Sequence, residues 1–172
     1  DIQFHDGNTI NEMSKSLNDI LYIEAYQLMQ KIVAEQDPLK KAELEAQFIQ
    51  LKNVGVNLDR VHPSTGKSIL HLIADAGDKG VLTRLDSKGV SVYLIGDNKP
   101  DKNGKTPMIT AIESGSLKHL DFASDLFKLS FHSRDDEMDA MKKALRKLKT
   151  DDKEIKAMKK GLLWDIKEEQ WD

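Results

Sequence analysis

A twelve-residue pattern that occurs twice constrains the fold of this chain more than any other feature. It runs from Gly66 to Gly77 as GKSILHLIADAG and from Gly104 to Gly115 as GKTPMITAIESG. Both copies begin and end with glycine, carry a hydroxyl residue in third place, and keep small or apolar residues between. A unit this small cannot bury its apolar face alone, so repeated units are expected to stack on one another.

The same stretches raise the question of a nucleotide site, because Gly-Lys-Ser and Gly-Lys-Thr also end a phosphate-binding loop. That loop needs a further glycine five residues earlier, where the backbone curls so that N–H groups face the phosphates. Val61 and Lys99 occupy that position in the two copies. We therefore expect no nucleotide site, and we predict that Lys67 and Lys105 are solvated.

Each copy carries the signals of a short helix with defined ends. Ser68 and Thr106 have side-chain oxygens suited to N-caps, and Pro107 stands where a first-turn proline loses no hydrogen bond. Gly77 and Gly115 are placed to end these helices and to turn the chain into a second helix.

The two copies resemble the ankyrin repeat, whose core reads G-x-T-P-L-H-x-A-A-x-x-G. Asp101 precedes Gly104 by three residues, as that pattern expects, and Gly55 and Gly89, which we predict to end second helices, are 34 residues apart. The family period is about 33 residues. The resemblance implies an all-α, ankyrin-type helix-turn-helix repeat stack with loop or β-turn fingers. It also implies a structural role for His71, which would hydrogen-bond near the hydroxyl of Ser68.

The second copy departs from the family pattern in two ways. It has Ile109 where the first copy has histidine, and the outer helix expected around residues 117–127 fits the pattern poorly.

Helical caps are expected at both ends of the stack. Apolar residues recur at helical spacing over 10–35, and Asp37-Pro38 signals a second helix to about residue 53. Two amphipathic helices are expected after residue 134, the second capped by Asp151 or Asp152. They either cap the last repeat or connect to a following domain.

We accordingly divide the chain into four parts. They are an N-terminal helical region with a degenerate first repeat (1–58), an ankyrin repeat (59–92), a repeat with an extended preceding loop (93–130), and a C-terminal helical cap or connector (131–172).

Composition excludes several classes of function. The chain has no cysteine, a net charge of −3, and no apolar run long enough to cross a membrane. No histidine or carboxylate pattern predicts a metal site, and no G-x-S-x-G elbow predicts a nucleophile. We expect no cofactor and no catalytic residue, and a monomeric protein that is cytoplasmic, with secretion into a host cell as the alternative. The absence of an initial methionine suggests a piece of a longer protein.

The C-terminal part contains a basic stretch and two tryptophans. Residues 142–160 include nine Lys or Arg and three acids. Such a stretch can bind an anionic membrane or nucleic acid, but flanking acids favour a solvated helix face, which we expect here. Trp164 is predicted to be half-buried, whereas Trp171 could be exposed and dock on a neighbour.

The resemblance implies a protein–protein interaction module that binds through a concave face and the repeat loops, here 59–65 and 93–103. The second loop is long, because the two copies are 38 residues apart, about five more than the family period. Three apolar residues would anchor a partner inside a polar rim, and two acids on the first helices would add to it. The predicted partner-binding residues are Asp59, Arg60, His62, Tyr93, Leu94, Ile95, Asp97, Asn98, Lys99, Asp101, Lys102, Asp75 and Glu113.

Two alternatives stay open. The chain could be a scaffold or targeting part of a larger effector enzyme whose catalytic domain lies outside it. It could also be a lipid or nucleic-acid binder that uses the basic helix 142–160.

Overall fold

The computed structural model describes residues 7–130 and 135–171. Within them the chain forms eight α-helices and one 3₁₀ helix, with no β-strand, so the predicted all-α class is confirmed. The helices are α1 (Gly7–Ala34), α2 (Pro38–Asn53), α3 (Ile69–Ala76), α4 (Lys79–Ser87), η1 (Val92–Leu94), α5 (Pro107–Ser114), α6 (Leu117–Leu129), α7 (Asp135–Lys147) and α8 (Lys153–Trp171).

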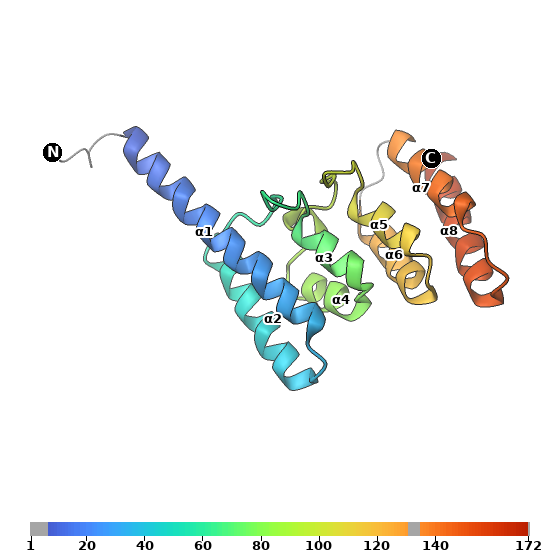
Figure 1. The fold of residues 1–172 in the computed structure, drawn as a ribbon, viewed down its shortest axis with the longest axis horizontal. Helices are drawn as coiled ribbons and strands as arrows, with labels where there is room; N and C mark the ends of the chain where they lie inside the picture. Colours follow the sequence, from blue (N-terminus) through green and yellow to red (C-terminus); the bar gives the residue numbers. More distant parts are fainter. Residues whose placement is uncertain (1–6, 131–134, 172) are drawn as a thin grey trace.

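The helices lie in two layers (Figure 1). In one layer α1 contacts α3, α3 contacts α5, and α5 contacts α7; in the other, α4 contacts α6 and α6 contacts α8. Buried side chains from helices of both layers form one hydrophobic core, with Phe48, Ile73 and Phe122 fully enclosed. The N-terminus of α1 and the α7–α8 pair lie at opposite ends of an elongated molecule (Figure 1).

The short helices α3 and α5 begin and end where their caps predict. Ser68 and Thr106 accept hydrogen bonds from the third backbone N–H of their helices, and Pro107 occupies the first turn of α5. Gly77 and Gly115 follow the helices with φ of +61° and +71°, a left-handed conformation that costs glycine little. The predictions for both helix boundaries are confirmed.

The helix pair α1–α2 also follows its sequence signals. Asp37 caps α2 by accepting from the backbone N–H of Leu39, and a proline opens the helix. The long α1 extends past α2, so the side chains of Met13, Leu17 and Ile20 on its N-terminal half are more than half exposed. Among the described side chains of α1, those that belong to the core lie in its C-terminal half.

Helix α6 lies where the outer helix of the second copy was expected, around residues 117–127. It is regular over 13 residues, starts at the N-cap Ser116 and buries five side chains. The buried side chains are those of Leu120, Phe122, Ala123, Leu126 and Phe127.

The C-terminal helices begin where they were predicted to begin, but the predicted burial of Trp164 is wrong. Asp135 opens α7 with an acidic first turn, and the Asp152 carboxylate accepts from the N–H groups of Glu154 and Ile155 at the start of α8. Trp164 was predicted to be half-buried, but it is 61% exposed because it stands on the side of α8 away from Leu162 and Ile166, which are buried.

Some predictions concern residues that the structure does not describe. The boundary at residue 131, the first six residues of the N-terminal part and the side chain of Trp171 lie outside the described residues. No helix in the described ranges is long and apolar enough to cross a membrane.

Candidate functional site

The first predicted loop, residues 59–65, belongs to a closed turn that ends at Lys67 and is tied to α1. The backbone N–H of His62 donates to the Lys67 carbonyl at 2.8 Å, and that of Gly66 donates to the His62 carbonyl at 2.8 Å. The hydroxyl groups of Tyr26 and Thr65 are 3.1 Å apart, and the rings of Tyr26 and His62 lie 4.5 Å centre to centre. The loop is thus held from one side by an aromatic residue of the first helix.

Arg60 joins the base of this loop to the same helix. The Tyr22 hydroxyl donates to the Arg60 carbonyl at 2.8 Å, the guanidinium lies 5.4 Å from the centre of the Tyr22 ring, and Arg60 pairs with Asp19. Burial, followed by the charge of Tyr26, raises the pKa of Tyr22, so its hydroxyl remains a donor at any physiological pH. Arg60 is therefore engaged with α1 in this structure.

The second predicted loop, residues 93–103, starts within η1, and Asp101 closes the part of it that leads towards α5. Its backbone N–H donates to the Lys105 carbonyl at 2.9 Å, and its carboxylate accepts from the N–H groups of Asn103 and Lys105 at 2.8 and 3.0 Å. Burial alone would raise the pKa of Asp101, but these two N–H groups, with His71 and Lys67 nearby, leave the pKa lowered. The carboxylate is thus ionised and committed to its own turn.

The tips of the two loops touch. A Cβ added to Gly66, whose φ is +70°, would lie 2.8 Å from the Cγ of Lys102 and 2.9 Å from its backbone nitrogen. Glycine is required there both by its left-handed backbone and by this close approach. The two loops therefore form one continuous surface.

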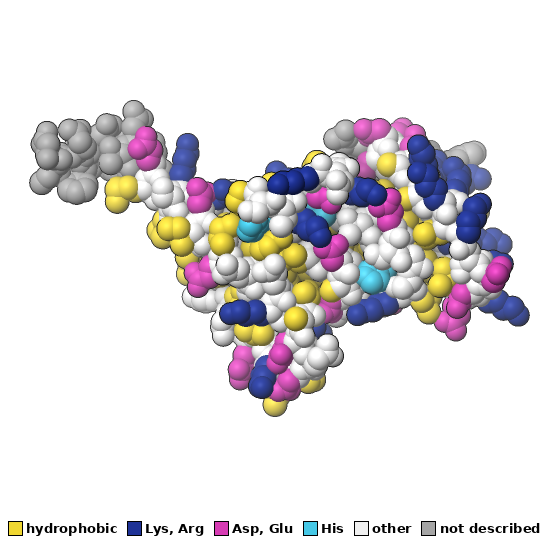
Figure 2. Space-filling view, in the orientation of Figure 1, with side chains coloured by type: hydrophobic (Ala, Val, Ile, Leu, Met, Phe, Trp, Pro, Cys, Tyr) yellow, Lys and Arg dark blue, Asp and Glu magenta, His cyan; other side chains and the backbone are white. Residues whose placement is uncertain are grey.

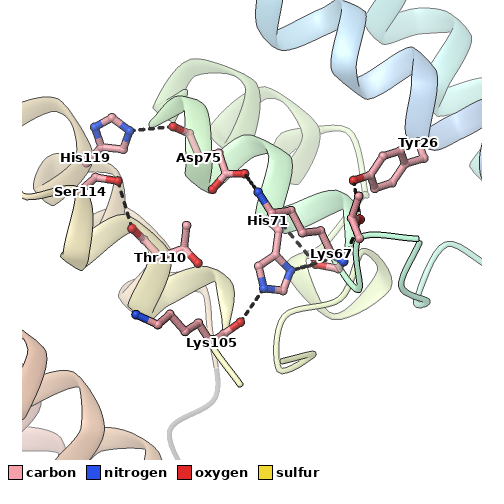
Figure 3. A network of polar contacts seen from close by, with 10 residues as sticks. Tyr26, Lys67, His71, Asp75, Lys105, Thr110, Ser114 and His119 are labelled. Atoms are coloured by element: carbon pink, nitrogen blue, oxygen red, sulfur yellow. Dashed lines mark hydrogen bonds and ion pairs between the residues drawn. The ribbon is translucent and has the colours of Figure 1, made fainter. Parts of the chain in front are cut away.

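His71 links helix α3 to the second loop (Figure 3). Its Nδ1 accepts from the backbone N–H of Ser68 at 2.9 Å, and its Nε2 lies 2.8 Å from the Lys105 carbonyl. Since Nδ1 accepts, we assign the proton to Nε2, which donates to the carbonyl. Burial lowers the pKa of His71, so a neutral ring with both nitrogens engaged is the stable form, and it is structural, not a free base.

The sequence analysis missed a second histidine of this kind. The Nδ1 of His119 lies 2.6 Å from the Ser116 hydroxyl, and its Nε2 lies 2.9 Å from the Asp75 carbonyl near the end of α3. A Cβ on Gly77 would be 3.0 Å from the His119 ring. The signal was present in the sequence, because Ser68 to His71 and Ser116 to His119 share the spacing Ser-x-x-His.

Two ion pairs repeat along the exposed edge of this surface. Lys67 lies 2.7 Å from Asp75, and Lys105 pairs with Glu113 at the same spacing of eight residues. The hydrogen bond from Asp75 raises the pKa of Lys67. Both lysines were predicted to be merely solvated, and both are instead partly covered and paired with acids that we had assigned to partner binding.

The structure corrects two of the predicted partner-binding residues. Ile95 is 1% exposed, because its side chain belongs to the core under the second loop. Asp97 is 7% exposed and accepts from the Ser130 hydroxyl at 2.9 Å. Neither side chain is available to a partner in this conformation.

The other predicted positions reach the surface but do not all lie together. Tyr93 and Leu94 are 37% and 41% exposed in η1, where the Tyr93 hydroxyl donates to the Leu129 carbonyl at the end of α6. Lys102 stands instead at the loop tip over Gly66. The remaining positions are exposed or half-buried; they are Asp59, Arg60, His62, Asn98, Lys99, Asp101, Asp75 and Glu113.

Across residues 7–130 and 135–171, no group of three or more His, Cys, Asp or Glu side chains could hold a metal ion. The sequence matches no protein-family model, and neither a curated protein nor a solved structure matches it. The surface must be interpreted from its own geometry.

Proposed function

We propose that this chain is a protein-interaction module, built as a short ankyrin-type repeat stack, and that it binds a partner through the two loop tips and the adjoining ends of α3 and α5. The observation that carries this proposal is a local arrangement that occurs twice. A capping hydroxyl opens each helix, a left-handed glycine follows it, and a Lys–acid pair eight residues apart runs along it.

The layering of the helices supports the repeat interpretation. Each short first helix contacts its counterpart in the next unit, α3 against α5, and each second helix does the same, α4 against α6. The bond from His71 to the Lys105 carbonyl fastens the first unit to the loop that opens the second. Such an arrangement presents successive loops and first helices on one side of a rigid scaffold.

The chemistry of the surface favours a polypeptide partner. The charges alternate in sign, with Lys67 and Lys105 beside Asp75 and Glu113, and Lys102 exposed at the tip. A mixed polar surface on a rigid support suits the rim of a protein interface, where paired charges select the partner and set its orientation.

The test is a comparison of two variants with the same change in net charge. Asp75→Asn/Lys102→Glu alters the proposed surface, and Asp86→Asn/Lys88→Glu alters exposed residues at the end of α4, away from it. Binding partners would be captured from cell lysate by the full chain and identified by mass spectrometry, after circular dichroism has shown that both variants are folded.

We expect a partner that is captured by the unaltered chain and by the α4 variant, and lost by the loop variant. Capture that survives in the loop variant, or no partner at all, would contradict the proposal.

A further inference from the structure

The outer face of α7 and α8 carries a groove that the proposed function does not use. It encloses about 970 Å³ and is lined by residues of both helices, including Lys142, Arg146, Lys160, Gly161, Trp164 and Lys167. The two helices lie at the end of the molecule opposite the N-terminus of α1 (Figure 1). Side chains of Lys and Arg gather at this end in the space-filling view (Figure 2).

An exposed tryptophan stands in the groove. Trp164 is 61% exposed, although an indole is among the side chains that gain most from burial. A Cβ placed on Gly161, one turn earlier on the same helix, would meet nothing within 4 Å, so the groove is open beside the indole. Tryptophan in an open groove is typical of the centre of a binding site, where it is covered by the partner.

The charges around Trp164 are mainly positive and largely uncommitted. Lys142 is held by Asp139 at 3.3 Å and by Gln170. In contrast, no hydrogen bond or ion pair joins the side chain of Arg146, Lys160 or Lys167 to another described residue. Three cations around an apolar ring complement a ligand that carries acidic groups around an apolar group.

The shape and the remaining charge favour a polypeptide over a membrane or a nucleic acid. The lining residues on α8 run from Ala157 to Gln170, about 20 Å along the helix axis at about 1.5 Å per residue. A concave, elongated groove suits a single inserted segment better than a flat bilayer. Asp165 also lines the groove, and it would repel a continuous phosphate backbone but can be accommodated by a peptide of mixed side chains.

We propose that the α7–α8 groove is a docking site for an acidic polypeptide segment with one large apolar residue that packs on Trp164. The segment's carboxylates pair with Arg146, Lys160 and Lys167. This site is separate from the loop surface, so either proposal can fail without the other.

The experiment uses a displayed library of random peptides, selected on the full chain. A length of about 12 residues spans the groove as a helix, at about 1.5 Å per residue. The peptides recovered are expected to be rich in Asp and Glu around a large apolar residue. Synthetic copies are then titrated against a Trp171→Phe form of the chain, which leaves Trp164 as the only tryptophan and lets its fluorescence report binding.

Three variants made in that form decide whether the groove is the site. Arg146→Glu/Lys160→Glu/Lys167→Glu is expected to weaken peptide binding by about tenfold or more, since opposed charges would then face one another. Trp164→Ala, read by calorimetry, is expected to weaken it by a similar factor. The matched control Lys149→Glu/Lys153→Glu/Lys156→Glu changes the net charge equally at exposed positions outside the groove and is expected to leave affinity within about twofold.

Other outcomes overturn the proposal. The assignment of this site would be wrong if the recovered peptides are not acidic or if no peptide is enriched. It would also be wrong if the groove variant and the control lose equal affinity for the peptides. Vesicles of phosphatidylcholine with phosphatidylserine and single-stranded oligothymidine are tested in parallel. If either binds with the same dependence on the groove residues while the peptides do not, the groove serves a different class of ligand.

Discussion

The Nε2 of His71 lies 2.8 Å from the carbonyl oxygen of Lys105, and this contact joins helix α3 to the loop that precedes α5. The same ring accepts a backbone N–H at its other nitrogen. One side chain therefore supports both the start of its own helix and the loop of the next helix pair, which is the geometry on which the proposed binding surface rests.

Replacing His71 is expected to lower the free energy of unfolding substantially. His71→Ala leaves the Ser68 N–H and the Lys105 carbonyl without this partner and opens space in a buried site, which should cost about 2–4 kcal/mol. Urea denaturation followed by circular dichroism would measure the loss. A loss below about 0.5 kcal/mol would show that water or a rearranged loop replaces the ring.

His71 should also make stability depend on pH. Burial lowers its pKa in the folded chain below the ordinary value of 6.5, so below that pH the unfolded chain binds a proton that the folded chain does not. The free energy of unfolding should therefore fall as the pH drops from 6.5 towards the lower pKa of the folded state. His71→Ala should lose this part of the pH dependence, whereas His119→Ala, which keeps His71, should retain it.

Gly96 is expected to tolerate no side chain. Its φ is +94°, and an added Cβ would lie 2.3 Å from the Cβ of Ser68, in the cap of α3. Gly96→Ala should therefore cost about 3 kcal/mol or more, from backbone strain together with overpacking. Gly104→Ala is the matched control, because Gly104 has φ of +76° but nothing within 4 Å of an added Cβ. It should cost about 1–2 kcal/mol from the left-handed backbone alone. Equal losses of stability in Gly96→Ala and Gly104→Ala, measured by thermal denaturation, would contradict the close contact between the second loop and α3.

The ion pair between Glu45 and Arg84 fastens α2 to α4. The Glu45 side chain is 3% exposed and accepts two hydrogen bonds from the guanidinium, at 2.8 and 3.1 Å. Arg84→Met should cost about 2 kcal/mol, below the range for a fully buried pair because Arg84 is itself about half exposed. The double variant Glu45→Met/Arg84→Met removes the stranded charge and should recover most of the loss. A double variant less stable than Arg84→Met would contradict this account, because Glu45 would then stabilise the fold without its arginine.

Lys67 provides a direct test of the expectation that no nucleotide binds. Its ammonium is paired with Asp75 and is partly exposed, so Lys67→Ala should change the free energy of unfolding by only about 0.2–1 kcal/mol. Calorimetric titration of the unaltered chain with ATP and Mg²⁺ should release no heat of binding. ATP binding that disappears in Lys67→Ala would overturn this expectation, which was based on Val61 at the position where a phosphate-binding loop needs glycine.

Local signals in the sequence were sufficient to predict where several helices begin and end. Caps and glycines predicted the ends of α2, α3 and α5, because a capping hydrogen bond or a left-handed turn depends on residues only a few positions apart. The all-α class was what the resemblance to the ankyrin repeat implied, and the structure confirms that class. The spacing of Ser116 and His119 was equally local, and it would have located the second histidine contact had it been compared with Ser68 and His71.

The contacts between residues distant in the chain could not be predicted from these local signals, because they depend on how the helices pack. Ile95 and Asp97 are buried because the second loop folds onto the start of α3 and the end of α6. Trp164 is exposed because other residues of α8, Leu162 and Ile166, face the core. It lines one groove with Arg146 because α7 packs beside α8. Alternation of polar and apolar residues tells which side of a helix can be buried, but which neighbour covers that side, and which surface is left open, depends on how separate units pack against one another.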